Sequence, residues 1–248
     1  MLTRHRREVG FTLISMMIGM VIALISVAAM LMLYRTLIVT AKQVNTQATR
    51  DREVAVGSLV SQEEIQQAGF GIADAAAGTD LVVLKDAALV EGRLSGTAIA
   101  SYTGSVSGNA IVWGYNPTAA SGAVDANGYM CEGLIVTDSG GDGGGLQWLA
   151  PVSCIRATAW QELTWTSHSL ASAQSVGAGA GFTVSSASCW PFGQTSAVNG
   201  LYVSYDQPDS SSGMAAQPTT TRSSSIEGQA TGGTTLAVFS ACLSNLHQ

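Results

Sequence analysis

Four cysteines are the residues whose chemistry is easiest to assign: Cys131, Cys154, Cys189 and Cys242. An even number of cysteines in an exported domain predicts two disulfides. Three pairings are possible, and we favour nearest neighbours along the chain, which joins Cys131 to Cys154 and Cys189 to Cys242. The alternative is a zinc site made of all four thiolates, but the chain lacks the closely spaced cysteine pairs that zinc modules use.

The remaining polar residues give no sign of catalysis. Beyond the first ten residues there are two histidines, His168 and His247, and no H-E-x-x-H, G-x-S-x-G or P-loop motif. We therefore predict that the protein is not an enzyme and uses no metal or cofactor. Asp138 and Asp142 flank a glycine-rich turn and could chelate calcium, although a solvated turn is the simpler interpretation. The five tryptophans could form a sugar-binding platform, but core packing is the expected use of most of them.

Composition excludes several classes of protein. Only 11% of the residues are charged and the net charge is −6. From Leu94 onward, eight acids stand against two cations, which argues against a nucleic-acid-binding head. The sequence has a single long apolar run, which argues against a polytopic transporter.

That apolar run is the main structural element near the N-terminus. The segment 11–34 has 24 residues without a charge, and as a helix it would be about 36 Å long, enough to cross a bilayer. Arg4, Arg6 and Arg7 precede it, so we expect the N-terminus to stay in the cytoplasm and everything after residue 35 to lie outside it.

The junction Gly10-Phe11 carries the most specific signal. A short basic leader that ends in glycine, followed by phenylalanine and an unbroken apolar helix, resembles the class III signal of type IV pilins and type II secretion pseudopilins. The resemblance implies removal of residues 1–10 by prepilin peptidase and N-methylation of Phe11. The competing interpretations are a plain signal peptide cut after Ala28 and an uncleaved signal anchor.

Ser15 departs from the family pattern. Pilins usually have glutamate as the fifth residue after the cleavage site, where it is thought to pair with the N-terminal amine of a neighbouring subunit. Serine can form a hydrogen bond but cannot supply that charge. Two explanations stay open: a residue that has drifted in a minor subunit, or a subunit at the filament tip that need not pair with one ahead of it.

The helical pattern continues beyond the apolar run. No proline occurs before Asn116, and apolar residues recur at helical spacing up to Leu59, so we predict one helix over residues 11–68 that ends at Gly69 and Gly71. The segment 61–71 resembles the end of the long helix in PilW-like minor pilins, in which acidic and amide residues precede Ala-Gly-aromatic-Gly.

Residues 69–248 are predicted to form a β-rich head. Short runs of β-branched and aromatic residues alternate with glycine, serine and asparagine turns. We expect an α+β, pilin-like fold in which the long N-terminal helix packs against an antiparallel sheet. The expected strands are 80–85, 97–102, 110–115, 134–137, 146–150, 163–166, 182–185, 201–205 and 234–239.

Together these features predict a PilW-like minor pilin that takes part in type IV pilus assembly and so supports twitching motility, adhesion or DNA uptake. The resemblance implies as partners other pilins, prepilin peptidase, the inner-membrane assembly platform and membrane lipid. It implies a single-pass protein of the bacterial inner membrane with its head in the periplasm, later exposed on the pilus. A type II secretion pseudopilin is one alternative. A membrane-anchored binding protein or adhesin with no filament role is another, from a different class.

Overall fold

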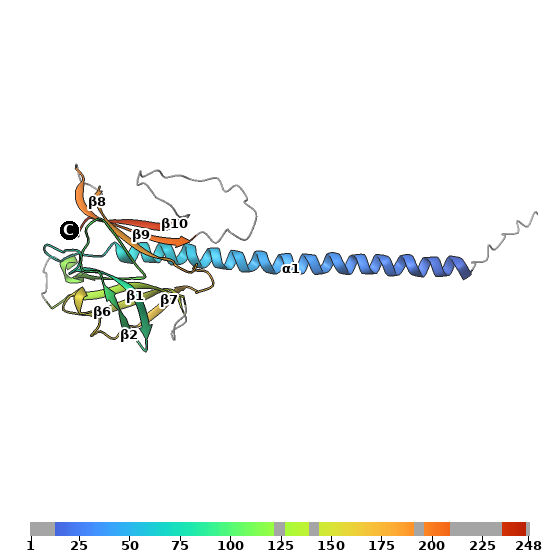
Figure 1. Cartoon of the computed structure of the whole chain (residues 1–248), viewed down its shortest axis with the longest axis horizontal. Helices are drawn as coiled ribbons and strands as arrows, with labels where there is room; N and C mark the ends of the chain where they lie inside the picture. The colour runs from blue at the N-terminus through green and yellow to red at the C-terminus, as the bar shows by residue number, and fades with distance from the viewer. Residues whose placement is uncertain (1–12, 122–126, 139–143, 191–195, 209–234, 247–248) are drawn as a thin grey trace, which may run out of the picture. The chain divides into compact units, whose positions relative to one another are not determined.

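A computed structural model describes residues 13–121, 127–138, 144–190, 196–208 and 235–246. The chain divides into two compact units, residues 1–49 and 50–248. Helix α1 (Leu13–Ile65) accounts for all described residues of the first unit and continues into the second. The prediction of one long N-terminal helix with antiparallel sheets, an α+β fold, is therefore confirmed (Figure 1).

The helix ends three residues earlier than the predicted residue 68. The last turn tightens, because the Ala68 N–H bonds to the Ile65 carbonyl at 3.1 Å, three residues back. Gly69 then takes a φ of 75°, a left-handed conformation that favours glycine, and its N–H bonds to the Gly114 carbonyl at 2.9 Å. The predicted glycine stop at Gly69 thus lies in the turn that follows the end of the helix at Ile65.

The head contains two antiparallel sheets where a single sheet was expected. A six-stranded sheet has the order β2-β1-β4-β5-β6-β7 and a four-stranded sheet has the order β10-β9-β8-β3. The first is built from β1 (Leu81–Val90), β2 (Arg93–Ala98), β4 (Ala110–Tyr115), β5 (Met130–Thr137), β6 (Gly145–Ser153) and β7 (Ser167–Ala171). The second is built from β3 (Ser105–Gly108), β8 (Gly181–Cys189), β9 (Val198–Pro208) and β10 (Thr235–Leu243). Two short 3₁₀ helices, η1 (Pro117–Ser121) and η2 (Ala157–Ala159), lie in the connections.

Most predicted strands overlap an observed one, and 110–115 coincides with β4. The prediction at 163–166 is wrong, because the chain there runs outside the sheets and β7 begins only at Ser167. Its Trp165 is buried against one face of the six-stranded sheet, so its apolar character reflects a covering segment. The strand expected at 97–102 overlaps only the last two residues of β2, and the serine- and glycine-rich β3 was not predicted.

Two apolar cores lie on opposite faces of the six-stranded sheet. The larger one combines residues of both sheets with the end of α1, including Ile65, Trp113 and Tyr205. The smaller one lies beneath the segment that carries η2, with Trp160 and Trp165 as its largest members. Every residue of β4 is buried, so this strand has apolar contacts on both faces and shows no polar alternation.

Two disulfides cross-link the head, in the nearest-neighbour pairing. Cys131–Cys154 ties β5 to the segment that follows β6. Cys189–Cys242 joins β8 to β10 across the intervening strand β9. Gly200 of β9 makes room for this crossing, because a Cβ atom there would lie 2.8 Å from the Cys189 sulfur.

Candidate functional site

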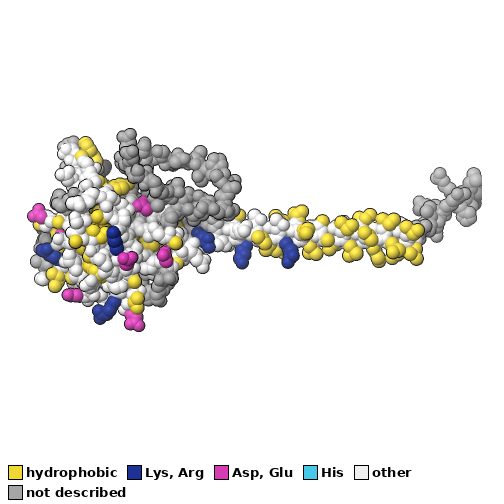
Figure 2. All heavy atoms as spheres, viewed as in Figure 1, with side chains coloured by type: hydrophobic (Ala, Val, Ile, Leu, Met, Phe, Trp, Pro, Cys, Tyr) yellow, Lys and Arg dark blue, Asp and Glu magenta, His cyan; other side chains and the backbone are white. Residues whose placement is uncertain are grey.

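The first candidate site is the apolar stretch of α1. Its large apolar side chains from Leu13 to Val39 are all exposed, and they occur on every side of the helix. Figure 2 shows apolar side chains covering most of the visible face of this part of α1. The first basic residue of the helix, Arg35, lies near the end of the stretch. Among the described residues, α1 is the one helix long and apolar enough to cross a membrane. A surface of this kind suits contact with lipid chains or other apolar helices.

The predicted processing residues fall partly outside the structure. Gly10 and Phe11 lie outside the described residues, as do Asp142 and His247. Ser15 lies within the apolar part of α1 and is exposed, so the position where pilins usually have glutamate presents an uncharged hydroxyl. Asp138 is exposed, and the described residues contain no group of three or more potential metal ligands among His, Cys, Asp and Glu.

The tryptophans do not form one exposed platform. Trp113, Trp160 and Trp165 are buried, whereas Trp190 is 68% exposed. Trp148 is half-buried and lies against the exposed His168, with ring centroids 5.4 Å apart. Core packing therefore accounts for three of the five, as expected.

The second candidate site is the join between the end of α1 and the head. Glu53 of α1 accepts three hydrogen bonds from the turn after β7: from the Ser172 N–H at 3.2 Å, the Ser172 hydroxyl at 2.7 Å and the Ser175 hydroxyl at 2.7 Å. These bonds, that of Ser175 first, hold the pKa of Glu53 below its ordinary value. The carboxylate thus fixes the helix to the turn while it is ionised.

Small side chains bring the same part of the helix close to the sheets. Gly57 leaves room for β7, because a Cβ atom there would lie 3.1 Å from the Leu170 carbonyl oxygen. Ser58 and Ser61 are buried on this face. On the other sheet, Gln62 donates to the Ser240 carbonyl of β10 at 3.2 Å. In this way α1 contacts β7 of one sheet and β10 of the other, and Figure 1 shows it passing between these two strands.

A buried acid lies beneath the last turn of the helix. Glu132 of β5 is fully buried in the core, and one of its carboxyl oxygens accepts a hydrogen bond from the Trp148 indole N–H. Its other oxygen accepts no hydrogen bond from any described residue. Burial, together with the charge of Glu64 on α1, raises the pKa of Glu132 to about 8. At neutral pH this side chain is therefore mostly protonated.

Sequence reasoning did not identify Glu53 or Glu132. Glu132 lies outside the predicted strand 134–137, because β5 begins earlier, at Met130, so its burial was not expected. Glu53 had no comparable signal, because its partners are serines about 120 positions later in the chain.

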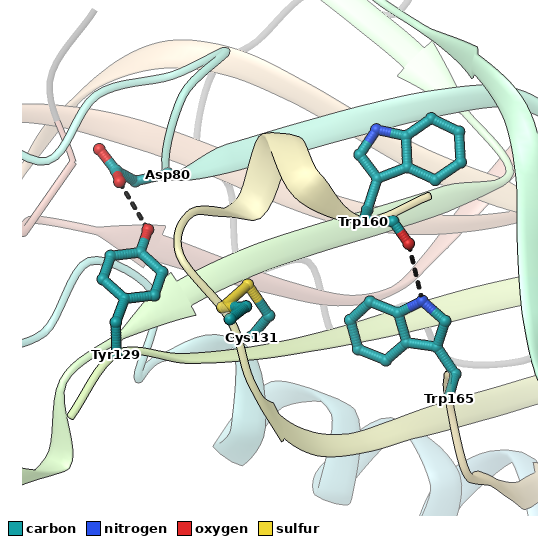
Figure 3. The surroundings of a disulfide bond; sticks show 6 residues. Asp80, Tyr129, Cys131, Trp160 and Trp165 are labelled. Carbon is teal, nitrogen blue, oxygen red and sulfur yellow. Dashed lines mark hydrogen bonds between the residues drawn. A yellow bond between two sulfur atoms is a disulfide. The ribbon is translucent and has the colours of Figure 1, made fainter. Parts of the chain in front are cut away.

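The Cys131–Cys154 disulfide lies between two hydrogen-bonded pairs (Figure 3). On one side, Tyr129 donates to the Asp80 carboxylate at 2.6 Å. On the other, the Trp165 indole donates to the Trp160 carbonyl at 3.1 Å within the smaller core. The disulfide thereby holds the covering segment over the sheet.

No protein-family model, curated protein or solved structure matches the chain. Its function is therefore inferred from its own residues.

Proposed function

We propose that the protein is a PilW-like minor pilin that takes part in type IV pilus assembly. One observation carries the proposal: a single helix is apolar on all sides over its first part and is built into a disulfide-bonded β-rich head over its last part. The Gly10-Phe11 junction directly precedes that helix. A signal peptide lost after Ala28 would remove more than half of the apolar stretch, and the helix would lose its membrane-spanning length.

The proposed mechanism is assembly. Before assembly, the apolar stretch lies in the inner membrane, where its backbone hydrogen bonds are satisfied within the helix. During assembly, contacts with other apolar helices replace contacts with lipid chains, so little free energy is lost when the subunit leaves the bilayer. The join at Glu53, Gly57 and Gln62 holds the helix to the head as the subunit moves.

Ser15 fits a subunit that does not need to attract the amine of a neighbour. A carboxylate at this depth costs roughly 2.5–3.5 kcal/mol in hydrocarbon unless a charged partner compensates. Serine avoids that cost, because its hydroxyl can bond to a carbonyl of its own helix. We therefore favour a minor subunit with few copies, and a tip position is the special case in which no subunit lies ahead.

The mature N-terminus tests this proposal. Purified protein from the native host is analysed by intact mass and N-terminal peptide sequencing, and we expect it to begin at methylated Phe11. Substitution Gly10→Val is expected to leave residues 1–10 attached. The matched control is Gly19→Ala, a glycine within the helix that has no atom within 4 Å of its Cβ position. A mature chain that begins at Met1 or Ala29 would contradict the proposal.

A deletion strain separates a pilus subunit from a type II secretion pseudopilin, which has the same kind of leader. Loss of surface pili and twitching with normal protein secretion supports the pilus role. Loss of secretion with normal pili identifies the secretion role instead. Normal pili together with normal secretion would remove the filament proposal altogether.

A further inference from the structure

A cavity of about 380 Å³ opens on the head, and none of its lining residues belongs to α1. It is formed by the loop that follows α1, by Tyr129 ahead of β5, and by Ile155 and Arg156 after β6. Its volume is in the lower part of the range of small-ligand sites. The proposed role of the protein makes no use of it.

The floor of the cavity is fixed by internal hydrogen bonds. Asp80 is more than nine-tenths buried, and its two carboxyl oxygens accept from the Ala76 N–H at 3.0 Å and the Tyr129 hydroxyl at 2.6 Å. Burial, followed by the bond to Asp80, raises the pKa of Tyr129, so the hydroxyl stays protonated and continues to donate. The ring fits against Gly114, where a Cβ atom would overlap the phenol. Because Asp80 and Tyr129 are hydrogen-bonded to each other, they form a fixed floor.

The rim, in contrast, carries charges that have no partner among the described residues. Arg156 and Asp74 are both exposed, and neither makes an ion pair or side-chain hydrogen bond within the described part of the chain. Asp74 has a φ of 54°, a left-handed conformation that is uncommon for residues other than glycine. Two isoleucines also line the cavity: Ile155, which is 83% exposed, and Ile72, which is half-buried.

We propose that this cavity binds a small zwitterion of amino-acid or dipeptide size. The Arg156 guanidinium offers paired N–H donors that match a carboxylate. The Asp74 carboxylate offers the acceptor for an ammonium group, since it is exposed, whereas Asp80 is buried and each of its oxygens already accepts one hydrogen bond. Ile72 and Ile155 contact an aliphatic side chain. The cavity thus offers one contact for each charged group of the ligand and apolar contacts for its side chain.

Four probes test the recognition of each charge. Leucine and leucyl-leucine carry both charged groups, N-acetyl-leucine lacks the ammonium, and leucinamide lacks the carboxylate. Binding to the full chain in detergent micelles is followed by ligand-observed NMR. We expect saturable binding of leucine or leucyl-leucine with a dissociation constant of about 1 mM or tighter, and at least about fivefold weaker binding of the two capped probes. Equal binding of all four probes would overturn the proposal, as would no saturable binding.

Substitutions locate the site. Arg156→Gln and Asp74→Asn are each expected to weaken binding about fivefold to tenfold. Arg93→Gln is the control for the arginine, because Arg93 is an exposed arginine outside the cavity. Asp86→Asn is the control for Asp74, because Asp86 is exposed and has a nearly identical φ of 52°. Loss in the controls, or unchanged binding in the two cavity variants, contradicts the assignment. None of these results depends on where the leader is cleaved, so this proposal and the pilin proposal fail separately.

Discussion

Replacing Glu132 by glutamine is expected to stabilise the head and to change its pH dependence. Glu132 is fully buried in the main core, where its pKa is raised from 4.5 to about 8. The folded head therefore holds a proton that the unfolded chain releases above pH 4.5. Stability is greatest below pH 4.5, and it falls as the pH rises toward 8 because the unfolded state binds fewer protons.

The magnitude follows from the size of the shift. Each pKa unit corresponds to about 1.36 kcal/mol, so the roughly 2.5 units between the ordinary pKa and pH 7 correspond to about 3 kcal/mol. Glutamine has nearly the same shape, can accept the bond from Trp148, and carries no proton to lose. We expect Glu132→Gln to have nearly the wild-type free energy of unfolding near pH 4 and to exceed it by about 3 kcal/mol at pH 7.

Tryptophan fluorescence during urea unfolding measures this difference. All five tryptophans lie between residues 113 and 190, so the signal reports the head and not the apolar stretch of α1. The full chain is unfolded in micelles at a series of pH values between 4 and 8. Glu162→Gln is the control, since Glu162 is an exposed acid in the same head. If Glu132→Gln and wild type have parallel pH profiles, Glu132 does not hold a proton in the folded head and the reasoning is wrong.

Three further substitutions test other contacts. Gly114→Ala would place a Cβ atom 2.1 Å from the Tyr129 hydroxyl. We expect this substitution to cost about 1–3 kcal/mol of unfolding free energy in urea melts. Most of that cost should disappear when Gly114→Ala is made in a Tyr129→Ala background. Gly200→Ala would crowd the disulfide that crosses β9, and a thiol assay on the purified chain is expected to detect free cysteines that are absent from wild type. Glu53→Gln removes a carboxylate whose pKa is lowered by its serine partners. In acid unfolding, wild type should lose stability as the pH falls below about 4.5, because the carboxylate becomes protonated. The variant should be less stable than wild type at neutral pH, and its stability should not fall in this way at acid pH.

The spacing of apolar residues predicted elements whose pattern is local in the sequence. It did not predict contacts between segments that are distant in the sequence. Helix α1 and strand β4 follow local patterns of apolar residues, so their positions were accessible from sequence. The division into two sheets was not, because it depends on which strand pairs with which. The segment around Trp165 has the composition of a strand but covers a sheet face, and composition does not distinguish the two.

The candidate site shows the same limit. The apolar stretch and the two disulfides could be predicted from the sequence, because residue type and spacing indicate them. The helix join was not, since Glu53 is one of several polar residues on a helix until the turn at Ser172 and Ser175 is placed beside it. Glu132 was not identified either, because it precedes the predicted strand 134–137 and because the charge that acts on it, that of Glu64, comes from α1.

One helix therefore meets two different requirements along its length. Over its first part, bulky apolar side chains are exposed on every side, which suits an environment of lipid chains or other helices. Over its last part, Gly57, Ser58 and Ser61 form a narrow buried face that lets the sheets approach closely. An apolar residue larger than alanine at position 57 would push Leu170 and its strand away, while the same residue at position 19 would meet open space. The absence of a side chain therefore matters for packing at Gly57 but not at Gly19. Substitution at Gly57 should disturb the head, while substitution at Gly19 should not.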